Sequence, residues 1–285
     1  MQDVRVPATD GLQLAATLHR PPATLRGGDP RALVVVAPAT GVARRYYRAF
    51  AEELAGAGFA ALTFDYRGTG GSRLAGREAH MHEWGERDLA GALEWLTDRF
   101  PGRPLLVVGH SVGGQVLGFA RSIDRVRAVL SVASQSGHWR LWPGPRRLQM
   151  GLYMHVIVPG LSRALGRLPF GLVGGEDLPA GVALEWSRWS RDPRYLQPTA
   201  EARGAQGYGA YAGPWRALCF TDDWYAPRRA VETLLTYYPR AASELRLVTP
   251  GDVGARAIGH FGFFRPLFKD TLWREARAWL EERAA

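Results

Sequence analysis

Short apolar runs alternate with amphipathic stretches through the first part of the chain. Residues 32–37 form a continuous apolar run rich in valine, and residues 59–65, 104–109 and 126–133 read as further strands. Runs of this kind are typical of strands buried on both faces of a parallel sheet. Between them, residues 46–57, 81–100 and 113–121 space their apolar side chains as a helix does. The alternation predicts an α/β fold, with crossover helices on both faces of a doubly wound, mostly parallel sheet.

Two further strand patterns precede this alternation. Residues 4–7 and 12–19 flank Asp10 and Gly11, which form a two-residue turn signal. We therefore expect an antiparallel hairpin ahead of the parallel strands.

The alternation stops between residues 135 and 214. This segment is rich in proline, glycine and tryptophan, and strand and helix patterns return only at residues 216–220, 228–238, 245–248 and 271–283. An insertion of this size most simply covers the carboxyl edge of the sheet, where open α/β sheets bind ligands. We expect a core made of residues 1–134 and 215–285, with residues 135–214 inserted as a helical cap, or lid.

The composition and charge of the chain argue against some classes of binding partner. The 285 residues carry 36 Lys and Arg against 27 Asp and Glu, a formal charge of +9. Lys269 is the one lysine, and no basic run exceeds two residues, so we expect no nucleic-acid partner. The apolar runs are too short for a membrane span, and the first residues lack a secretory pattern. These features predict a cytoplasmic protein. Cys219, the single cysteine, is predicted to be a buried structural thiol.

One motif in the core points to covalent catalysis. Residues 109–113, Gly-His-Ser-Val-Gly, fit G-x-S-x-G between a predicted strand and a predicted helix. A sharp turn there would expose the hydroxyl of Ser111, and side chains at Gly109 or Gly113 would collide with the neighbouring strand and helix. Ser111 is therefore the candidate nucleophile.

A serine nucleophile needs a base, and the base needs an orienting acid. Of seven histidines, His260 alone lies in a glycine-rich loop after the last predicted strand, at the sheet edge where Ser111 is expected. Asp222 and Asp223 follow the strand at 216–220. Adjacent carboxylates point in different directions, so one of them can meet His260, and the residues alone leave the choice open.

Stabilisation of a developing oxyanion needs two preorganised donors. The backbone N–H of Val112, the residue after the nucleophile, is one candidate. The second is expected from residues 38–41, where small residues allow close approach; Thr40 is preferred and Ala39 is the alternative.

Aromatic residues are candidates for substrate contact. Trp139 and Trp186 lie in the predicted lid, and Trp224 and Tyr225 follow the candidate acid. Either these residues line an acyl-binding site or they are core aromatics that hold the helices together.

These motifs together resemble those of the α/β-hydrolase superfamily, over nearly the whole chain. The resemblance rests on Gly-His-Ser-Val-Gly-Gly at 109–114, on Asp-Tyr-Arg-Gly-Thr-Gly-Gly-Ser at 65–72, and on the order Ser111, Asp223, His260. The chain is most similar to bacterial predicted hydrolases of the serine-aminopeptidase type, including its residues 178–186. In many members the acid stands four residues before a proline, which favours Asp223, four before Pro227. The His-Gly common in the oxyanion loop of such proteins is replaced here by Pro38-Ala39.

The resemblance implies acyl transfer through a Ser111–His260–Asp223 triad, with an ester or thioester of an apolar acid as substrate. An acyltransferase or a peptidase would use the same triad, and a non-catalytic binding protein is a third class. We expect a small acyl substrate, no metal or other cofactor and no membrane span; a homodimer is compatible with the sequence.

Overall fold

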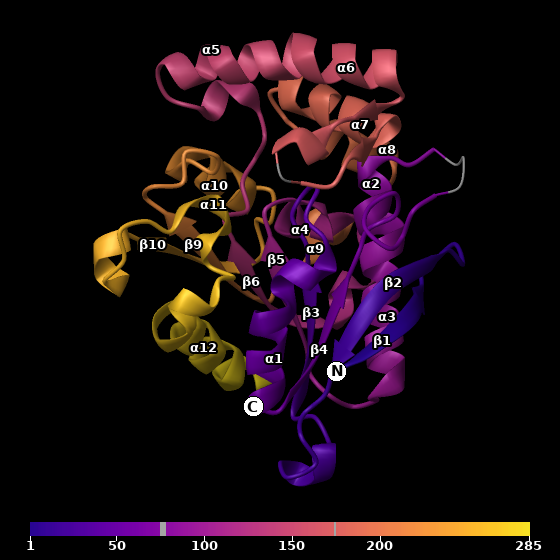
Figure 1. The fold of residues 1–285 in the computed structure, drawn as a ribbon, viewed down its shortest axis with the longest axis vertical. Helices are drawn as coiled ribbons and strands as arrows, with labels where there is room; N and C mark the ends of the chain where they lie inside the picture. Colours follow the sequence, from indigo (N-terminus) through magenta and orange to yellow (C-terminus); the bar gives the residue numbers. More distant parts are fainter. Residues whose placement is uncertain (75–77, 174) are drawn as a thin grey trace.

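One mixed sheet forms the centre of the molecule (Figure 1). The computed structural model describes residues 1–74, 78–173 and 175–285, and within these ranges the sheet has eight strands in the order β1-β2-β4-β3-β5-β6-β9-β10. The β1–β2 and β2–β4 pairs are antiparallel and the others are parallel. The strands are β1 (Gln2–Pro7), β2 (Gln13–His19), β3 (Ala32–Ala37), β4 (Phe59–Phe64), β5 (Leu105–His110), β6 (Val126–Val132), β9 (Pro214–Phe220) and β10 (Ala242–Val248).

The predicted α/β sheet is confirmed, as is the hairpin. β3, β4 and β5 are buried at every position, as their unbroken apolar runs require. The loop of this hairpin spans residues 8–12 and includes Asp10 and Gly11. Ala8 N–H donates to the carbonyl of Leu12 at 2.8 Å, and Gly11 has a φ of 85°.

Helices cover both faces of the sheet. On one face α1 (Arg48–Gly56) and α12 (Arg274–Ala284) lie side by side (Figure 1), joined by Arg277 Nη1 and Glu53 Oε1 at 2.8 Å. The crossover connections place α3 (Ala90–Arg99), α4 (Val112–Gln115) and α10 (Arg228–Leu235) on the other face. Two short helices, α2 (Met81–Glu83) and α11 (Gly259–Gly262), lie before α3 and after β10.

Two of the predicted helices are interrupted in the structure. The helix expected at 113–121 is α4 followed by a 3-10 turn, Val116–Phe119. Glycines weaken this helix, and a Cβ on Gly118 would lie 2.5 Å from the ring of Tyr208. The helix expected at 81–100 is divided by a π-turn at Trp84–Leu89. Gly85 lies in it, and a Cβ there would be 2.1 Å from the carbonyl oxygen of Val116. Gly85 thus lets the two segments pack closely, whereas Gly118 makes room for the ring of Tyr208 on a later helix.

The 135–214 segment, described except for residue 174, is mainly helical. Figure 1 shows α5 and α6 at the top of the molecule, with α7 between them and the sheet. Its last helix instead packs near the 3-10 turn that follows α4, as the Gly118–Tyr208 contact shows. Its elements are α5 (Pro145–Leu152), α6 (Val158–Leu165), β7 (Arg167–Leu168), β8 (Leu178–Pro179), α7 (Ala180–Arg191), α8 (Gln197–Ala202) and α9 (Gly207–Ala210). Among the described residues no helix is both long enough and apolar enough to cross a membrane.

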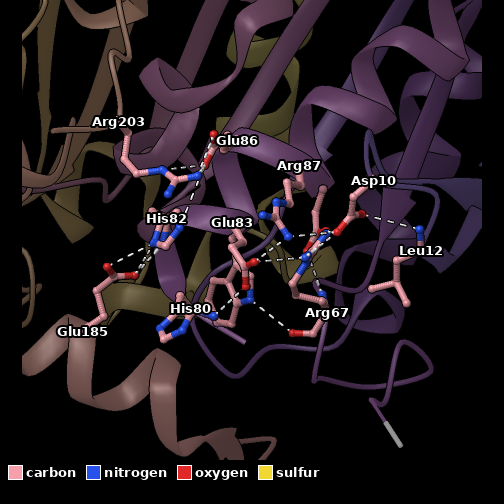
Figure 2. A network of polar contacts seen from close by, with 12 residues as sticks. Asp10, Leu12, Arg67, His80, His82, Glu83, Glu86, Arg87, Glu185 and Arg203 are labelled. Carbon is pink, nitrogen blue, oxygen red and sulfur yellow. Dashed lines mark hydrogen bonds and ion pairs between the residues drawn. The ribbon is translucent and has the colours of Figure 1, made fainter. Parts of the chain in front are cut away.

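A polar seam joins this segment to the core (Figure 2). His82, on α2, meets Glu185 of α7: its backbone N–H and its Nδ1 lie 3.0 and 2.9 Å from Glu185 Oε2. Nearby, Arg203 donates three hydrogen bonds to the carboxylate of Glu86. Glu185 is 5 % exposed, so its contacts with His82 fix α7 on the core.

Arg67, also drawn in Figure 2, is held by hydrogen bonds to two aspartates. Its Nε and its backbone N–H donate to the two carboxylate oxygens of Asp88, each at 2.8 Å, and its guanidinium also reaches Asp10. Asp65, two residues earlier, accepts the backbone N–H groups of Arg44 and Gly71. These hydrogen bonds fix the loop formed by the 65–72 motif.

Candidate active site

Ser111 lies on a strained turn between β5 and α4. Its backbone has φ 50° and ψ −114°, a conformation that is rare for a residue with a Cβ and is kept where the surroundings force it. A Cβ on Gly113 would lie 2.2 Å from the carbonyl oxygen of Ala37, and one on Gly109 would lie 2.7 Å from the nitrogen of Gly114. The glycines are thus required for the turn, as predicted.

His260 and Asp223 meet at the same edge of the sheet. His260 Nδ1 lies 2.7 Å from Asp223 Oδ2, and the two residues are 9 % and 4 % exposed. With Asp223 ionised, the Nδ1–H of His260 donates to the carboxylate, which leaves the Nε2 lone pair available as a base. Asp223 Oδ1 accepts N–H groups from Tyr225 and Ala226 at 2.8 and 3.1 Å. These bonds hold the carboxylate in a fixed orientation.

Asp222 points elsewhere. Its Oδ2 accepts the backbone N–H groups of Ile258 and Gly259 at 2.8 and 3.0 Å. Asp222 thus anchors the loop that leads to His260.

A buried chain of hydrogen bonds, here called the relay, runs from Ala39 through Tyr47 and His110 to His260 at this edge. Ala39 N–H donates to the hydroxyl of Tyr47 at 2.8 Å, and that hydroxyl lies 2.8 Å from His110 Nδ1. His110 Nε2 lies 2.9 Å from the carbonyl oxygen of His260. Since a carbonyl only accepts, Nε2 carries the proton, and Tyr47 donates to Nδ1. Burial lowers the pKa of His110 well below its usual value, in agreement with this neutral form.

The relay bears on the two candidates for the second oxyanion donor. The N–H of Ala39 is engaged by Tyr47, whereas Thr40 follows on the same loop and is partly exposed. Val112 begins α4, where the first N–H groups of a helix lack helical acceptors. These contacts favour Thr40 over Ala39 as the partner of Val112.

The four aromatic candidates lie in different surroundings. The ring of Tyr225 is 5.0 Å from that of His260. Trp224 is 47 % exposed, with the guanidinium of Arg146 5.3 Å from its ring. Trp139 packs against the outer helices, near His155 and Arg147. Trp186 is buried on α7 against Tyr153 and Phe170. Of the four, Tyr225 is thus the one in aromatic contact with the candidate base.

The sequence and the fold of this chain are similar to those of known proteins. A family model described as serine aminopeptidase, S33, matches residues 28–196, more than half of the chain. The chain belongs to this family. It is a member of the α/β-hydrolase superfamily, and its mixed eight-stranded sheet, flanked by helices, matches solved structures of that fold.

Solved structures similar to this S33 family member include esterases and a lipase. A soluble variant of monoglyceride lipase from Saccharomyces cerevisiae, in complex with a substrate analogue, has a TM-score of 0.69 at 16% identity, covering 98% of this chain and 96% of that one. A thermophilic esterase from Thermogutta terrifontis has 0.61 at 16% identity, covering 100% of both. Est1E from Butyrivibrio proteoclasticus, with ferulic acid bound, has 0.62 at 14% identity, covering 98% of both. At these identities the likeness establishes the fold alone.

Sequence reasoning missed part of the surroundings of the site in this S33 family member. Tyr47 was assigned only to a predicted helix and His110 only to the motif, although both are buried. Phe261, with its ring 5.0 Å from that of His260, was also missed. A chain pattern carries no signal for these contacts, because Tyr47 and His110 meet across 63 positions.

Cys219 is free and buried, and burial raises the pKa of its thiol to about 12. The thiol is therefore protonated at neutral pH and a poor nucleophile, which agrees with the predicted structural thiol.

Proposed function

We propose that this protein is a serine hydrolase that cleaves carboxylic esters or thioesters of apolar acids through an acyl-enzyme intermediate. One observation carries the proposal. A buried His260–Asp223 pair, joined at 2.7 Å, shares the sheet edge with a serine held at positive φ between a strand and a helix.

In the proposed first step Ser111 Oγ attacks the substrate carbonyl as His260 Nε2 takes the hydroxyl proton. The backbone N–H groups of Val112 and Thr40 stabilise the oxyanion. When the carbonyl re-forms, the bond to the leaving group breaks, and His260 returns its proton to the departing alcohol or thiol. Asp223 stabilises the imidazolium while it lasts.

In the second step water attacks the acyl-enzyme and His260 Nε2 accepts its proton. Collapse of this intermediate breaks the bond to Ser111 Oγ, which takes the proton back from His260. The products are the free acid and the original enzyme.

Aromatic residues near His260 and in the 135–214 segment suit the binding of an apolar acyl group. Tyr225 lies against His260, and we propose that it contacts the acyl group together with Trp224, Trp139 and Trp186, beneath a lid formed by residues 135–214. Similar structures are titled as esterases and as a monoglyceride lipase. The family description, serine aminopeptidase, makes a peptidase the second candidate, since the same residues would attack an amide.

Steady-state hydrolysis of p-nitrophenyl acyl esters, thioesters and amino-acid p-nitroanilides by the wild-type protein tests the proposal. Esters or thioesters should have the higher kcat/KM. Ser111→Ala should lower kcat for them by a factor on the order of 10⁴ or more, because triad residues act as a unit. The matched control is Ser136→Ala, a buried serine whose hydroxyl pairs with Tyr237 at 2.9 Å. It should keep kcat within about tenfold. Undiminished activity in Ser111→Ala would exclude the mechanism, and preference for the anilides would favour the peptidase.

A further inference from the structure

An apolar stripe faces away from the protein along its outermost helices. These helices, α5 and α6 with the π-turn Tyr153–Ile157 between them, lie at the top of the molecule in Figure 1 and are called the outer helix (residues 145–165) here. Six large apolar residues on it are between 39 % and 73 % exposed. They are Leu148, Leu152, Val156, Ile157, Leu161 and Leu165.

The spacing of these residues makes one continuous stripe. Leu148 and Leu152 are four apart, Ile157 follows after five, and Leu161 and Leu165 follow after four each. The five-residue step spans the π-turn, whose wider ring advances the chain by one extra residue. The helix therefore keeps its apolar residues in line on the outside, while Met150, Met154 and Val158 are buried on its other side.

The chain around the stripe carries positive charge alone. Between Asp124 and Glu176 the sequence has no acidic residue. The outer helix itself carries Arg146, Arg147 and Arg163, all exposed. Arg167, just beyond it, pairs with Asp177 at 3.3 Å. Within the described residues Arg146, Arg147 and Arg163 form no ion pair, and exposed leucines beside such arginines are typical of helices that lie in the interface of an anionic membrane.

We propose that the outer helix docks on the surface of an anionic phospholipid bilayer, with its leucines in the acyl boundary and its arginines among the phosphates. Charge favours this occupant over a second copy of the chain. A symmetric contact would place the same surface of each copy against the other, which brings arginines to arginines. The proposal concerns this surface and does not depend on the hydrolase activity.

Flotation of the full-length protein with vesicles tests the proposal. Vesicles of phosphatidylglycerol and phosphatidylcholine in equal amounts should carry the protein upward, and vesicles of phosphatidylcholine alone should carry much less. Added salt should reverse the binding, because it screens the arginines. The double variant Arg147→Gln/Arg163→Gln should lower the partition coefficient roughly 25-fold, since each basic residue near such a surface contributes about fivefold.

Two matched variants measure the contribution of the leucines to vesicle binding. Leu148→Ser, at a residue 73 % exposed on the outer helix, should lower partitioning about tenfold. Leu267→Ser, at a residue 76 % exposed in a 3-10 turn before α12, should leave it unchanged. Arg121→Gln/Arg240→Gln, at exposed arginines elsewhere, is the matched charge control. All four variants should keep the circular dichroism of the parent protein.

Three results would overturn the proposal. One is the absence of flotation with the mixed vesicles, and another is equal binding to both vesicle types. The third is a dimer in sedimentation without lipid that Leu148→Ser dissociates, because the stripe would then be an interface between two copies.

Discussion

His110 carries out no step of the proposed reaction, yet it joins two segments that do. Its Nε2–H bonds the carbonyl of His260, and its Nδ1 accepts from Tyr47, whose hydroxyl also holds Ala39. A 5.3 Å separation of the His110 and His260 rings accompanies these bonds. These hydrogen bonds fix two segments to His110, the residue beside Ser111. One is the loop that carries the candidate oxyanion donor, and the other is the backbone of the candidate base.

The two adjacent aspartates give a prediction at this scale. Asp223→Asn should lower kcat for ester hydrolysis by about 10³ to 10⁴, because an amide neither fixes the required tautomer of His260 nor stabilises its cation. Asp222→Asn should lower kcat by less than about tenfold, since its amide oxygen still accepts the N–H groups of Ile258 and Gly259. Steady-state kinetics of the two variants are the measurement. The reverse order of effects would assign the acid role to Asp222.

Residues defined by local chain chemistry were the predictable ones. Ser111 could be singled out because glycines at 109 and 113 meet a steric need that is visible in five residues. Asp223 could not be separated from Asp222 on residues alone, because the direction of each carboxylate depends on how the turn after β9 folds. Tyr47 could not be found, since its contact with His110 depends on two elements meeting in space.

At the scale of elements, the seam between α2 and α7 decides how the 135–214 segment is held. Burial by itself would raise the pKa of Glu185, but hydrogen bonds from His82 and the charge of Arg188 hold that pKa below its ordinary 4.5. A carboxylate with a lowered pKa in the folded state stabilises the fold above its unfolded pKa. That contribution is lost as the pH falls through the folded value.

Glu185→Gln should therefore lower the free energy of unfolding at pH 7 by about 1–3 kcal/mol. The difference from the parent protein should shrink as the pH falls below the ordinary pKa of 4.5 and through the lower pKa of the folded state. Urea denaturation at several pH values measures both effects. The control Glu201→Gln removes an exposed pair with Arg194 and should cost less than about 1 kcal/mol. Equal losses in the two variants would show that the seam does not hold the segment.

Element types were predictable, whereas helix continuity was not. The apolar runs of β3, β4 and β5 determine their type, because each strand is buried on both faces. The breaks in the helices come from partners distant in the sequence, as where Gly85 approaches Val116 and Gly118 approaches Tyr208. Periodicity within one helix cannot reveal such contacts.

On the scale of the whole molecule, buried neutral histidines couple stability to pH. His110, His19 and His138 are buried, and burial lowers the pKa of each below 6.5. Below pH 6.5 the unfolded chain therefore binds more protons than the folded chain. The free energy of unfolding should fall as the pH decreases from 7 to 5, by up to about 1.4 kcal/mol per pH unit for each such histidine.

A substitution at His19 tests the contribution of one histidine to this pH dependence of stability. Within the described residues its ring nitrogens have no hydrogen-bond partner, so His19→Leu loses no bond and should flatten the pH dependence by up to one proton. Chemical denaturation between pH 5 and 8 provides the slopes. A slope that is the same in His19→Leu and in the parent protein would contradict this account.

The topology of the molecule explains why function could be approached from the sequence at all. In a doubly wound sheet, segments that follow β3, β5, β9 and β10 meet at one edge, so residues from 38 to 260 can be assigned to one site by chain order alone. The 135–214 segment follows no such rule, and the direction of its apolar stripe depends on a π-turn that the sequence pattern did not indicate.

The central claim is that Ser111 is a nucleophile activated by His260 and Asp223. Its most direct test is incubation of the full chain with a fluorophosphonate probe, followed by mass mapping of the labelled peptide. We expect one adduct, on Ser111, that is absent in Ser111→Ala and forms much more slowly in Asp223→Asn. An adduct on another residue, or no adduct on a protein that hydrolyses esters, would contradict the claim.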